Sequence, residues 1–362
     1  MSPDIDPVVK TAVQTASRPV TRPAATRPLR LQLLARLALP LGLSLAACGL
    51  LGWYLLRHPE QWQTVSLASP WMIGVCAAAS LAALLAPGLI FQVMTSRVGR
   101  NVGLAESTWL AVMTTAINSV VPLHAGAAAR AVYLKRRHDL DLSAFAATFL
   151  GYNILRLLAA SVAALIAGGW LLMPWGGGET AVSALNAAAP ATAGLKGLVA
   201  IAGGLAVAAI GACLVRPAWL GRLGLGRLEQ HRLLKPLFKF QAGWHELMRC
   251  PRFLLKVLAL VMLQITAELV VVWAAWGAVG VPLSVAAVVL VTSFGILTGL
   301  TGLTPGGLGL VELVTVAVGA TVAVEPAHGI AAGLVARGVS MAVLAAATPV
   351  AFAGLAACRP RV

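Results

Sequence analysis

The chain has 362 residues, of which 59% are hydrophobic and only 11% are charged, and its mean hydropathy is +0.87. Soluble globular proteins carry about 25% charged residues, so this composition excludes a soluble enzyme, and its hydrophobicity excludes a disordered chain. Apolar runs of about 20 residues instead predict an all-α polytopic membrane protein. The net charge of +15 arises from basic residues clustered between these runs, which favours anionic lipid surfaces over nucleic acid as partners.

The N-terminal region predicts a tail followed by an anchor. Residues 1–36 are polar, basic and rich in Pro, Thr and Ala, which is typical of a disordered tail on a cytoplasmic surface. The apolar run at 37–56 is longer than the core of about 7–15 residues in a cleaved signal peptide, so we expect an uncleaved membrane span. The five cysteines contain no C-x-x-C pair, which indicates packing residues without a disulfide framework or metal site.

Eight further apolar runs follow, at 71–95, 105–121, 142–173, 197–215, 257–276, 284–303, 308–324 and 329–357. The run 105–121 has basic residues on both sides and is followed by Pro122 and Gly126. Because both flanks are then cytoplasmic by the positive-inside rule, we predict a re-entrant helical hairpin that breaks near 121–126. The runs 284–303 and 308–324 are broken at Thr304-Pro305-Gly306-Gly307 and lack basic flanks, which predicts a second re-entrant hairpin from the opposite side.

This assignment gives six full spans, two hairpins and cytoplasmic termini in a bacterial inner membrane, with the transmembrane domain at 37–357 and a cytoplasmic end at 358–362. All but four of the 27 Lys and Arg residues then lie in cytoplasmic segments, the exceptions being Arg57, Lys196, Arg156 and Arg337. The basic segment 216–256, which contains interleaved aromatic residues, predicts amphipathic helices that lie on the bilayer.

The two halves of the chain, about 71–173 and 257–357, repeat one pattern of Pro, Gly and intramembrane Arg. The pattern consists of Pro122, Gly126 and Arg156 in the first half and of Pro305, Gly309 and Arg337 in the second. Because the halves start on opposite sides of the membrane, we interpret them as an inverted-topology repeat. Broken helices at matching positions of such repeats indicate a substrate site near the bilayer midplane.

The charged residues within apolar runs are the strongest candidates for this site. An Arg in the middle of a spanning helix costs about 2.5–3.5 kcal/mol on insertion scales and is functional by default, so Arg156 and Arg337 are expected to bind a lipid phosphate. Glu312 and Glu268 could pair with these arginines as structural ion pairs, receive a cationic head group or carry a proton. Gln264 lies four residues before Glu268 and shares its helical face.

Residues at the two breaks complete the predicted site, because the free N–H groups at the start of a half-helix suit a phosphate. They are Asn118, Pro122, His124, Gly126 and Arg130 in the first hairpin and Pro305, Gly306, Gly307 and Gly309 in the second. His124 could donate to a phosphate, shuttle protons or cap a helix end. Arg130 could instead be a cytoplasmic anchor.

Two sequence elements resemble a known family. They are Asn118-Ser119-Val120-Val121-Pro122-Leu123-His124-Ala125-Gly126, which is followed by Arg130, and Thr304-Pro305-Gly306-Gly307-Leu308-Gly309-Leu310-Val311-Glu312. With Arg156 and Arg337, they resemble the lysylphosphatidylglycerol synthetase/flippase transmembrane family over about residues 30–357. Ala127 stands where the first family element has Glu, and the acid that often follows the first intramembrane Arg is absent.

This resemblance implies a flippase-like membrane domain. Bifunctional members of the family add a cytosolic domain that aminoacylates phosphatidylglycerol. Because the chain ends five residues after its last predicted span, we expect a stand-alone member. Such members are associated with moving or exporting lipids, and they include hopanoid-pathway relatives.

The sequence has no P-loop, H-E-x-x-H, G-x-S-x-G or metal-ligand cluster, so we expect neither catalysis nor a cofactor. We predict a translocase for anionic or aminoacylated phospholipids or for an isoprenoid lipid, and we leave a homo-oligomer open. The alternatives are a membrane transferase acting on a lipid or polyprenyl phosphate through Asp139, Asp141 or Glu312, and a scaffold for lipid synthesis or export.

Overall fold

Every secondary-structure element among the described residues is helical. The computed structural model describes residues 69–97, 101–173, 189–214, 250–302, 304–321 and 324–358. The predicted tail, the first predicted span, most of segment 216–256 and the last four residues lie outside the described residues. The chain divides into Met1–Leu39, which is not described, and Pro40–Val362, which contains all the helices below.

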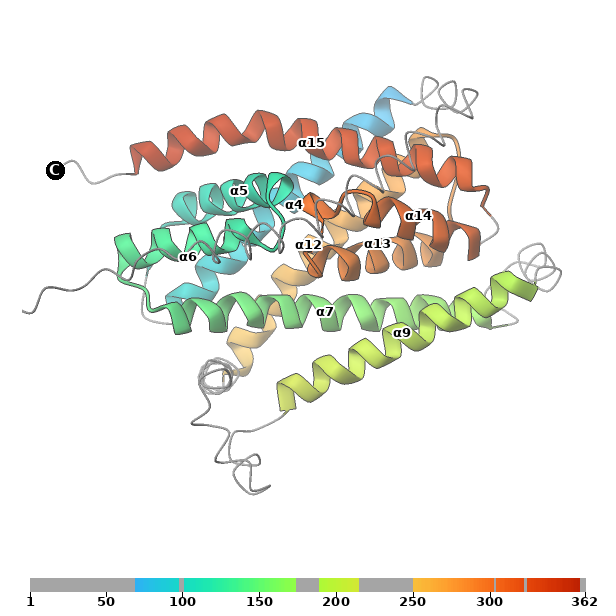
Figure 1. Ribbon diagram of the computed structural model, residues 1–362, viewed down its shortest axis with the longest axis horizontal. Coiled ribbons are helices and arrows are strands. Elements are labelled where there is room, and N and C mark those ends of the chain that lie inside the picture. Colours follow the sequence, from blue (N-terminus) through green and yellow to red (C-terminus); the bar gives the residue numbers. More distant parts are fainter. Residues whose placement is uncertain are drawn as a thin grey trace, which may run out of the picture. The chain divides into compact units, whose positions relative to one another are not determined.

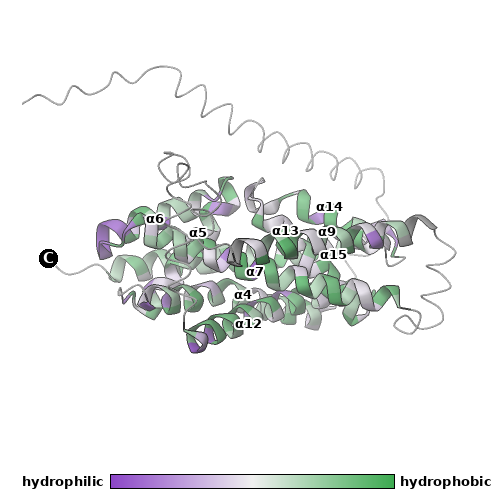
Figure 2. Ribbon diagram, turned by 90° about the horizontal axis from the view of Figure 1, so that it is seen from below, coloured by the Kyte–Doolittle hydropathy of each residue, from purple (hydrophilic) through white to green (hydrophobic). Residues whose placement is uncertain are grey.

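Five of the described helices are long and apolar enough to cross a membrane: α4 (Pro70–Arg97), α7 (Leu142–Leu172), α9 (Ala189–Leu214), α12 (Pro251–Ala278) and α15 (Pro326–Ala357). Hydrophobic residues cover most of their surface, whereas hydrophilic residues gather at the outer end of α6 (Figure 2). Helices without a polar face suit a lipid environment rather than water. The predicted polytopic all-α membrane architecture is therefore confirmed.

Helix α9 begins at Ala189 instead of residue 197, so Lys196, which we predicted to lie outside the span, belongs to α9. The starts of α12 and α15 also differ from the sequence prediction. Helix α12 begins at Pro251 instead of residue 257, so the last residues that we assigned to the amphipathic segment belong to α12. Helix α15 begins at Pro326 instead of residue 329. In both helices the first position is proline, which has no N–H to leave unpaired and whose fixed φ suits the first helical turn.

The first predicted break separates α5 (Leu104–Val120) from α6 (Ala125–His138). Between them Leu123 and His124 adopt left-handed φ values of 62° and 55°. Asn118 closes this hairpin, because its Oδ1 accepts a hydrogen bond from Gly126 N at 2.8 Å. A Cβ atom on Gly126 would lie 2.2 Å from the Thr114 carbonyl oxygen, so the two helices approach this closely only with glycine here.

The second predicted break separates α13 (Val285–Leu300) from α14 (Leu310–Thr321), with the short 3-10 helix η2 (Pro305–Gly307) between them. Gly306, Gly307 and Gly309 have φ values of 56°, 74° and 78°, a region that glycine occupies without steric cost. The helices thus break at both predicted sites. The re-entrant path of each hairpin through a membrane stays a prediction.

The two halves have the same element order. Helices of 28, 17, 14 and 31 residues in the first half correspond to helices of 28, 16, 12 and 32 residues in the second. Helices α4 and α12 pack antiparallel, and Ser69 N donates to Ala278 O at 3.2 Å. Helix α7 packs against α13 and α15 packs against α5, so the last long helix of each half packs against the hairpin of the other half. The inverted relation of the two halves stays a prediction. Figure 1 shows α7 and α15 running in opposite directions.

The tips of the two hairpins touch each other. Leu123 N donates to Gly302 O at 3.0 Å, and His124 Nε2 lies 3.3 Å from Leu300 O. A Cβ atom on Gly306 would lie 3.3 Å from Ser119 Cα, so η2 packs directly on the end of α5. Through these contacts the break of the first hairpin lies directly against the break of the second hairpin.

Candidate functional site

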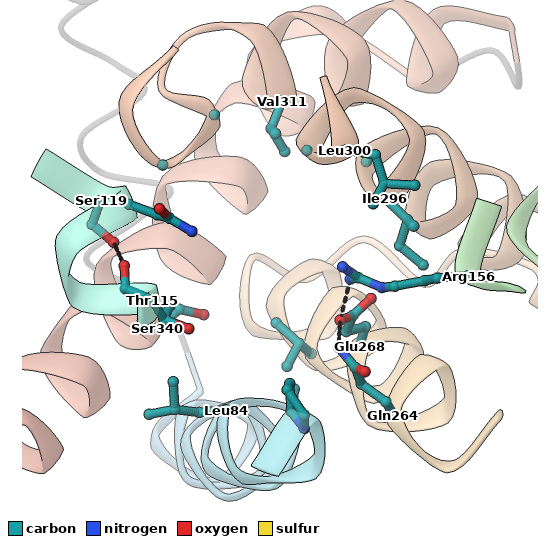
Figure 3. Close-up of a pocket in the computed structure, with 18 of the residues that line it drawn as sticks. Leu84, Thr115, Ser119, Arg156, Gln264, Glu268, Ile296, Leu300, Val311 and Ser340 are labelled. Atoms are coloured by element: carbon teal, nitrogen blue, oxygen red, sulfur yellow. Dashed lines mark hydrogen bonds and ion pairs between the residues drawn. The ribbon is translucent and has the colours of Figure 1, made fainter. Parts of the chain in front are cut away.

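A cavity of about 530 Å³ lies between the halves and is lined by residues of α4, α5, α6, α7, α12, α13, α14 and α15 (Figure 3). Its volume is within the range of small-molecule sites. Most of the predicted site residues line it: Asn118, Pro122, His124, Arg130, Arg156, Glu268, Gly306, Gly307, Glu312 and Arg337. The lining does not include Gly126, Pro305 or Gly309, which shape the hairpin tips.

Arg156 and Glu268 form one wall of the cavity. Arg156 Nη2 donates to Glu268 Oε1 at 2.5 Å, and Gln264 Nε2 donates to the same oxygen at 3.0 Å. Tyr152 Oη then donates to Gln264 Oε1 at 2.8 Å. Figure 3 shows Arg156 from α7 meeting Glu268 and Gln264 from α12. The shared helical face predicted for Gln264 and Glu268 is confirmed by their hydrogen bond.

Arg337 and Glu312 form a second ion pair at the η2 tip. Arg337 Nε donates to Glu312 Oε1 at 3.0 Å, and Arg337 Nη1 donates to the Gly306 carbonyl at 2.5 Å. The other carboxylate oxygen, Glu312 Oε2, accepts from Gly309 N at 2.8 Å. Arg337 and Glu312 therefore fix the backbone of the glycine-rich break from both sides.

Both ion pairs leave guanidinium donors without acceptors. Among the described residues, Arg156 Nε and Arg337 Nη2 are buried and have no hydrogen-bond partner. A buried donor without a partner costs about 1–3 kcal/mol. An oxyanion that enters the cavity can recover this cost with small rotations of either side chain, because guanidinium groups match the geometry of phosphate oxygens.

Hydroxyl groups and apolar side chains form the remaining walls. Thr115 and Ser119 of α5 and Ser340 of α15 lie opposite Arg156 in Figure 3. Ser340 Oγ lies 3.0 Å from Ser80 Oγ of α4. These hydroxyls were not among the predicted site residues. For Thr115 and Ser119 the signal was a group of Thr and Ser residues in the otherwise apolar run before the first break.

His124 occupies the N-cap position of α6, but its side chain makes no capping hydrogen bond. Its ring instead contacts Leu300 O of the other hairpin and packs edge-on against Phe149, with 6.0 Å between the ring centroids. The helix-end cap that we considered for His124 is thus not observed. The side chain joins the two hairpin tips and lines the cavity.

Arg130, a predicted site residue, lines the cavity, and so does Tyr152, which was not predicted. Arg130 is only 8% exposed and lines the cavity, so it is not the solvated anchor that we considered. Its Cζ lies 3.5 Å from the centroid of the Phe91 ring. Tyr152 lies one helical turn before Arg156, lines the cavity and donates to Gln264 Oε1. That four-residue spacing was the signal that could have identified Tyr152.

Asp139 and Asp141, which we considered for a transferase, lie at the junction of α6 and α7 and do not line the cavity. Asp139 is the left-handed C-cap residue of α6, with φ of 49°. Asp141 is the N-cap residue of α7, and its Oδ2 accepts from Ser143 Oγ at 2.5 Å. Their positions are those of helix-terminal residues.

Comparison with known families matches residues 32–347 to the lysylphosphatidylglycerol synthase TM region. A search of curated proteins finds no significant match. The matched residues include the first half, the second half up to residue 347, both broken hairpins and all the charged residues of the cavity. The broken hairpins and the intramembrane arginines that suggested this family from sequence are thus part of the matched region, and the chain belongs to the lysylphosphatidylglycerol synthase transmembrane-region family.

Proposed function

We propose that the protein is a lipid translocase of the bacterial inner membrane. A phosphate-bearing head group enters the cavity between the two halves while its acyl chains stay in the bilayer. Arg156 and Arg337 hold the phosphate, and the hydroxyl wall of Thr115, Ser119 and Ser340 contacts the rest of the head group.

The observation that carries this proposal is the pair of incompletely bonded guanidinium groups inside an apolar helical bundle. Arg156 Nε and Arg337 Nη2 have no hydrogen-bond partner among the described residues, yet both side chains line a cavity large enough for a head group. Ionisable residues inside a membrane mark substrate pathways by default. Here the ion pairs with Glu268 and Glu312 leave one buried nitrogen of each guanidinium without an acceptor. A phosphate supplies the missing acceptors.

The contact between the hairpin tips is the part of the bundle that has to change for a head group to cross. It consists of the hydrogen bond from Leu123 N to Gly302 O, the contact of His124 Nε2 with Leu300 O, and the packing of Gly306 on Ser119. Separating these tips exposes the Leu123 N–H, the carbonyls of Gly302 and Leu300 and the His124 ring, polar groups that the head group and water can solvate. The sequence has no nucleotide-binding motif, so we propose downhill movement or coupling to an ion or the membrane potential.

The orientation follows from the basic residues at one end of the bundle. The last turn of α4 carries Arg97, and the last turn of α6 carries Lys135, Arg136 and Arg137. Arg252 is the second residue of α12. These ends lie together on the left of Figure 1. We propose that this end faces the cytoplasm, as the positive-inside rule requires.

The proposal is tested by reconstituting the full chain into vesicles that contain phosphatidylglycerol labelled on an acyl chain with a reducible fluorophore. Added dithionite quenches outer-leaflet label at once, and inner-leaflet label only after it crosses. We expect wild-type protein to quench beyond the outer-leaflet fraction. Arg156→Gln and Arg337→Gln should slow this phase roughly tenfold or more, because each loses charged hydrogen bonds to phosphate.

Arg252→Gln is the matched control, because it removes one positive charge from an exposed position of α12 away from the cavity. Its rate should equal that of wild type. A scaffold role predicts no movement by any variant and tolerance of leucine at both arginines. Equal rates for wild type and both cavity variants would contradict the translocase proposal.

A further inference from the structure

The charges of the cavity do not balance. Among the described residues that line it, the charged side chains are Arg130, Arg156, Arg337, Glu268 and Glu312. Glu268 accepts from Arg156 and Gln264, and Glu312 accepts from Arg337 and Gly309 N. Both carboxylates are therefore engaged by this chain's own donors, and one guanidinium remains.

The remaining guanidinium is that of Arg130, and it is more than nine-tenths buried. Its Nε and Nη2 have no hydrogen-bond partner, and no carboxylate of the described residues pairs with it. The face of the guanidinium rests on Phe91, with Cζ 3.5 Å from the ring centroid. An aromatic face orients a cation and stabilises it modestly, but it does not cancel the charge.

A second buried donor lies on the opposite hairpin. Thr304 Oγ1 has no hydrogen-bond partner among the described residues, and Thr304 lines the same cavity beside η2. Donors without acceptors thus come from the first hairpin, the second hairpin, α7 and α15. The cavity offers an oxyanion several hydrogen bonds, but it offers an ammonium no free carboxylate.

We propose that the cavity selects lipids whose head group carries a net negative charge, with a phosphate as the recognised group, and that Arg130 is the residue that determines this selectivity. The inference rests on the proposed function and adds a substrate class to it. An anionic head group neutralises the surplus guanidinium. A head group with an additional amine places an ammonium near an uncompensated positive charge in a medium of low dielectric constant, which disfavours its binding.

The test uses the full chain in nanodiscs that contain equal amounts of phosphatidylglycerol, phosphatidylethanolamine and lysylphosphatidylglycerol. Native mass spectrometry of the extracted protein counts the bound lipids of each class. We expect wild type to retain phosphatidylglycerol in preference to lysylphosphatidylglycerol by roughly tenfold or more. Arg130→Gln should reduce this preference by about the same factor, and Arg130→Lys, which keeps the charge, should retain part of it.

Arg136→Gln is the matched control, because it removes one charge from an exposed position of the same helix that does not line this cavity. It should leave the preference unchanged. A separate measurement adds inorganic phosphate or phosphatidylglycerol to the detergent-solubilised protein and records thermal unfolding, which distinguishes a lipid head group from free phosphate. Stabilisation by phosphatidylglycerol but not by inorganic phosphate supports the inference. Equal stabilisation by inorganic phosphate would identify a soluble anion as the ligand and contradict the inference.

The two proposals fail in different ways. Wild-type protein that binds lipids without charge preference, or with unchanged preference in Arg130→Gln, overturns the selectivity and leaves translocation standing. Wild-type protein that retains no lipid of any class overturns both proposals. Loss of preference in Arg136→Gln as large as in Arg130→Gln would show that surface charge, not the cavity, makes the selection.

Discussion

Glu268 joins α12 to α7 through a single carboxylate oxygen. Oε1 accepts from both Arg156 and Gln264, and the side chains of Arg156 and Glu268 are 19% and 20% exposed. A fully exposed ion pair contributes little to the free energy of unfolding, whereas breaking a fully buried one costs several kcal/mol. The partly buried pair of Arg156 and Glu268 is expected to contribute an intermediate amount. The bond therefore has a structural role in addition to presenting Arg156 to the cavity.

This position predicts a loss of stability when the carboxylate is removed. Glu268→Gln leaves Arg156 without its counter-ion and should lower the free energy of unfolding by about 1–3 kcal/mol. Thermal unfolding of the detergent-solubilised protein measures the change. The control is Glu325→Gln, because the Glu325 side chain is 72% exposed and lies 3.7 Å from His328. A shift in the control as large as that of Glu268→Gln would contradict this role.

The residues of this site were predictable from the sequence in identity but not in pairing. Arg156, Arg337, Glu268 and Glu312 stand out because charges are rare in apolar runs. Which carboxylate pairs with which arginine could not be deduced, because Arg156 and Glu268 are 112 residues apart. The burial of Arg130 was equally hidden, since it depends on Phe91 of another helix.

At the scale of elements, the two hairpins depend on glycine where their tips meet. Gly302 has φ of 59°, and its carbonyl accepts from Leu123 N. A Cβ atom at this position would lie 2.6 Å from His124 Nε2. Both the backbone conformation and the neighbouring hairpin therefore exclude a side chain.

Gly302→Ala should consequently destabilise the protein by about 1 kcal/mol or more, because alanine is strained at positive φ and displaces His124. Thermal unfolding measures this loss. The matched control is Gly299→Ala, which is one turn earlier in α13 and where a Cβ atom would meet nothing within 4 Å. Alanine favours a helix more than glycine does, so this control should be neutral or more stable. Equal destabilisation by both substitutions would contradict the tip contact.

The breaks themselves were readable from sequence, because Pro122 and the Pro305-Gly306-Gly307 cluster are local signals that end helices. The contact between Leu123 and Gly302 was not, because it requires both halves to be packed. The starts of α12 and α15 were predicted too late for a different reason. Hydropathy marks where a run becomes apolar, whereas these two helices start at the prolines that precede the apolar run.

At the scale of the whole molecule, two similar halves surround one polar cavity. Helices α4 and α12 pack antiparallel along the centre, and the pairs α7 with α13 and α15 with α5 flank them. The cavity receives one intramembrane arginine from each half, Arg156 on α7 and Arg337 on α15. A substrate held between them contacts both halves at once, which is the arrangement that alternating exposure to two membrane sides requires.

A structure of the full chain in phosphatidylglycerol nanodiscs tests most directly whether a lipid head group occupies this cavity. We predict a phosphate with oxygens about 2.8 Å from guanidinium nitrogens of Arg156 and Arg337, and acyl chains that leave between helices into the bilayer. Ordered lipids found only on the outer surface of the bundle, with the cavity arginines bonded to protein alone, would contradict it.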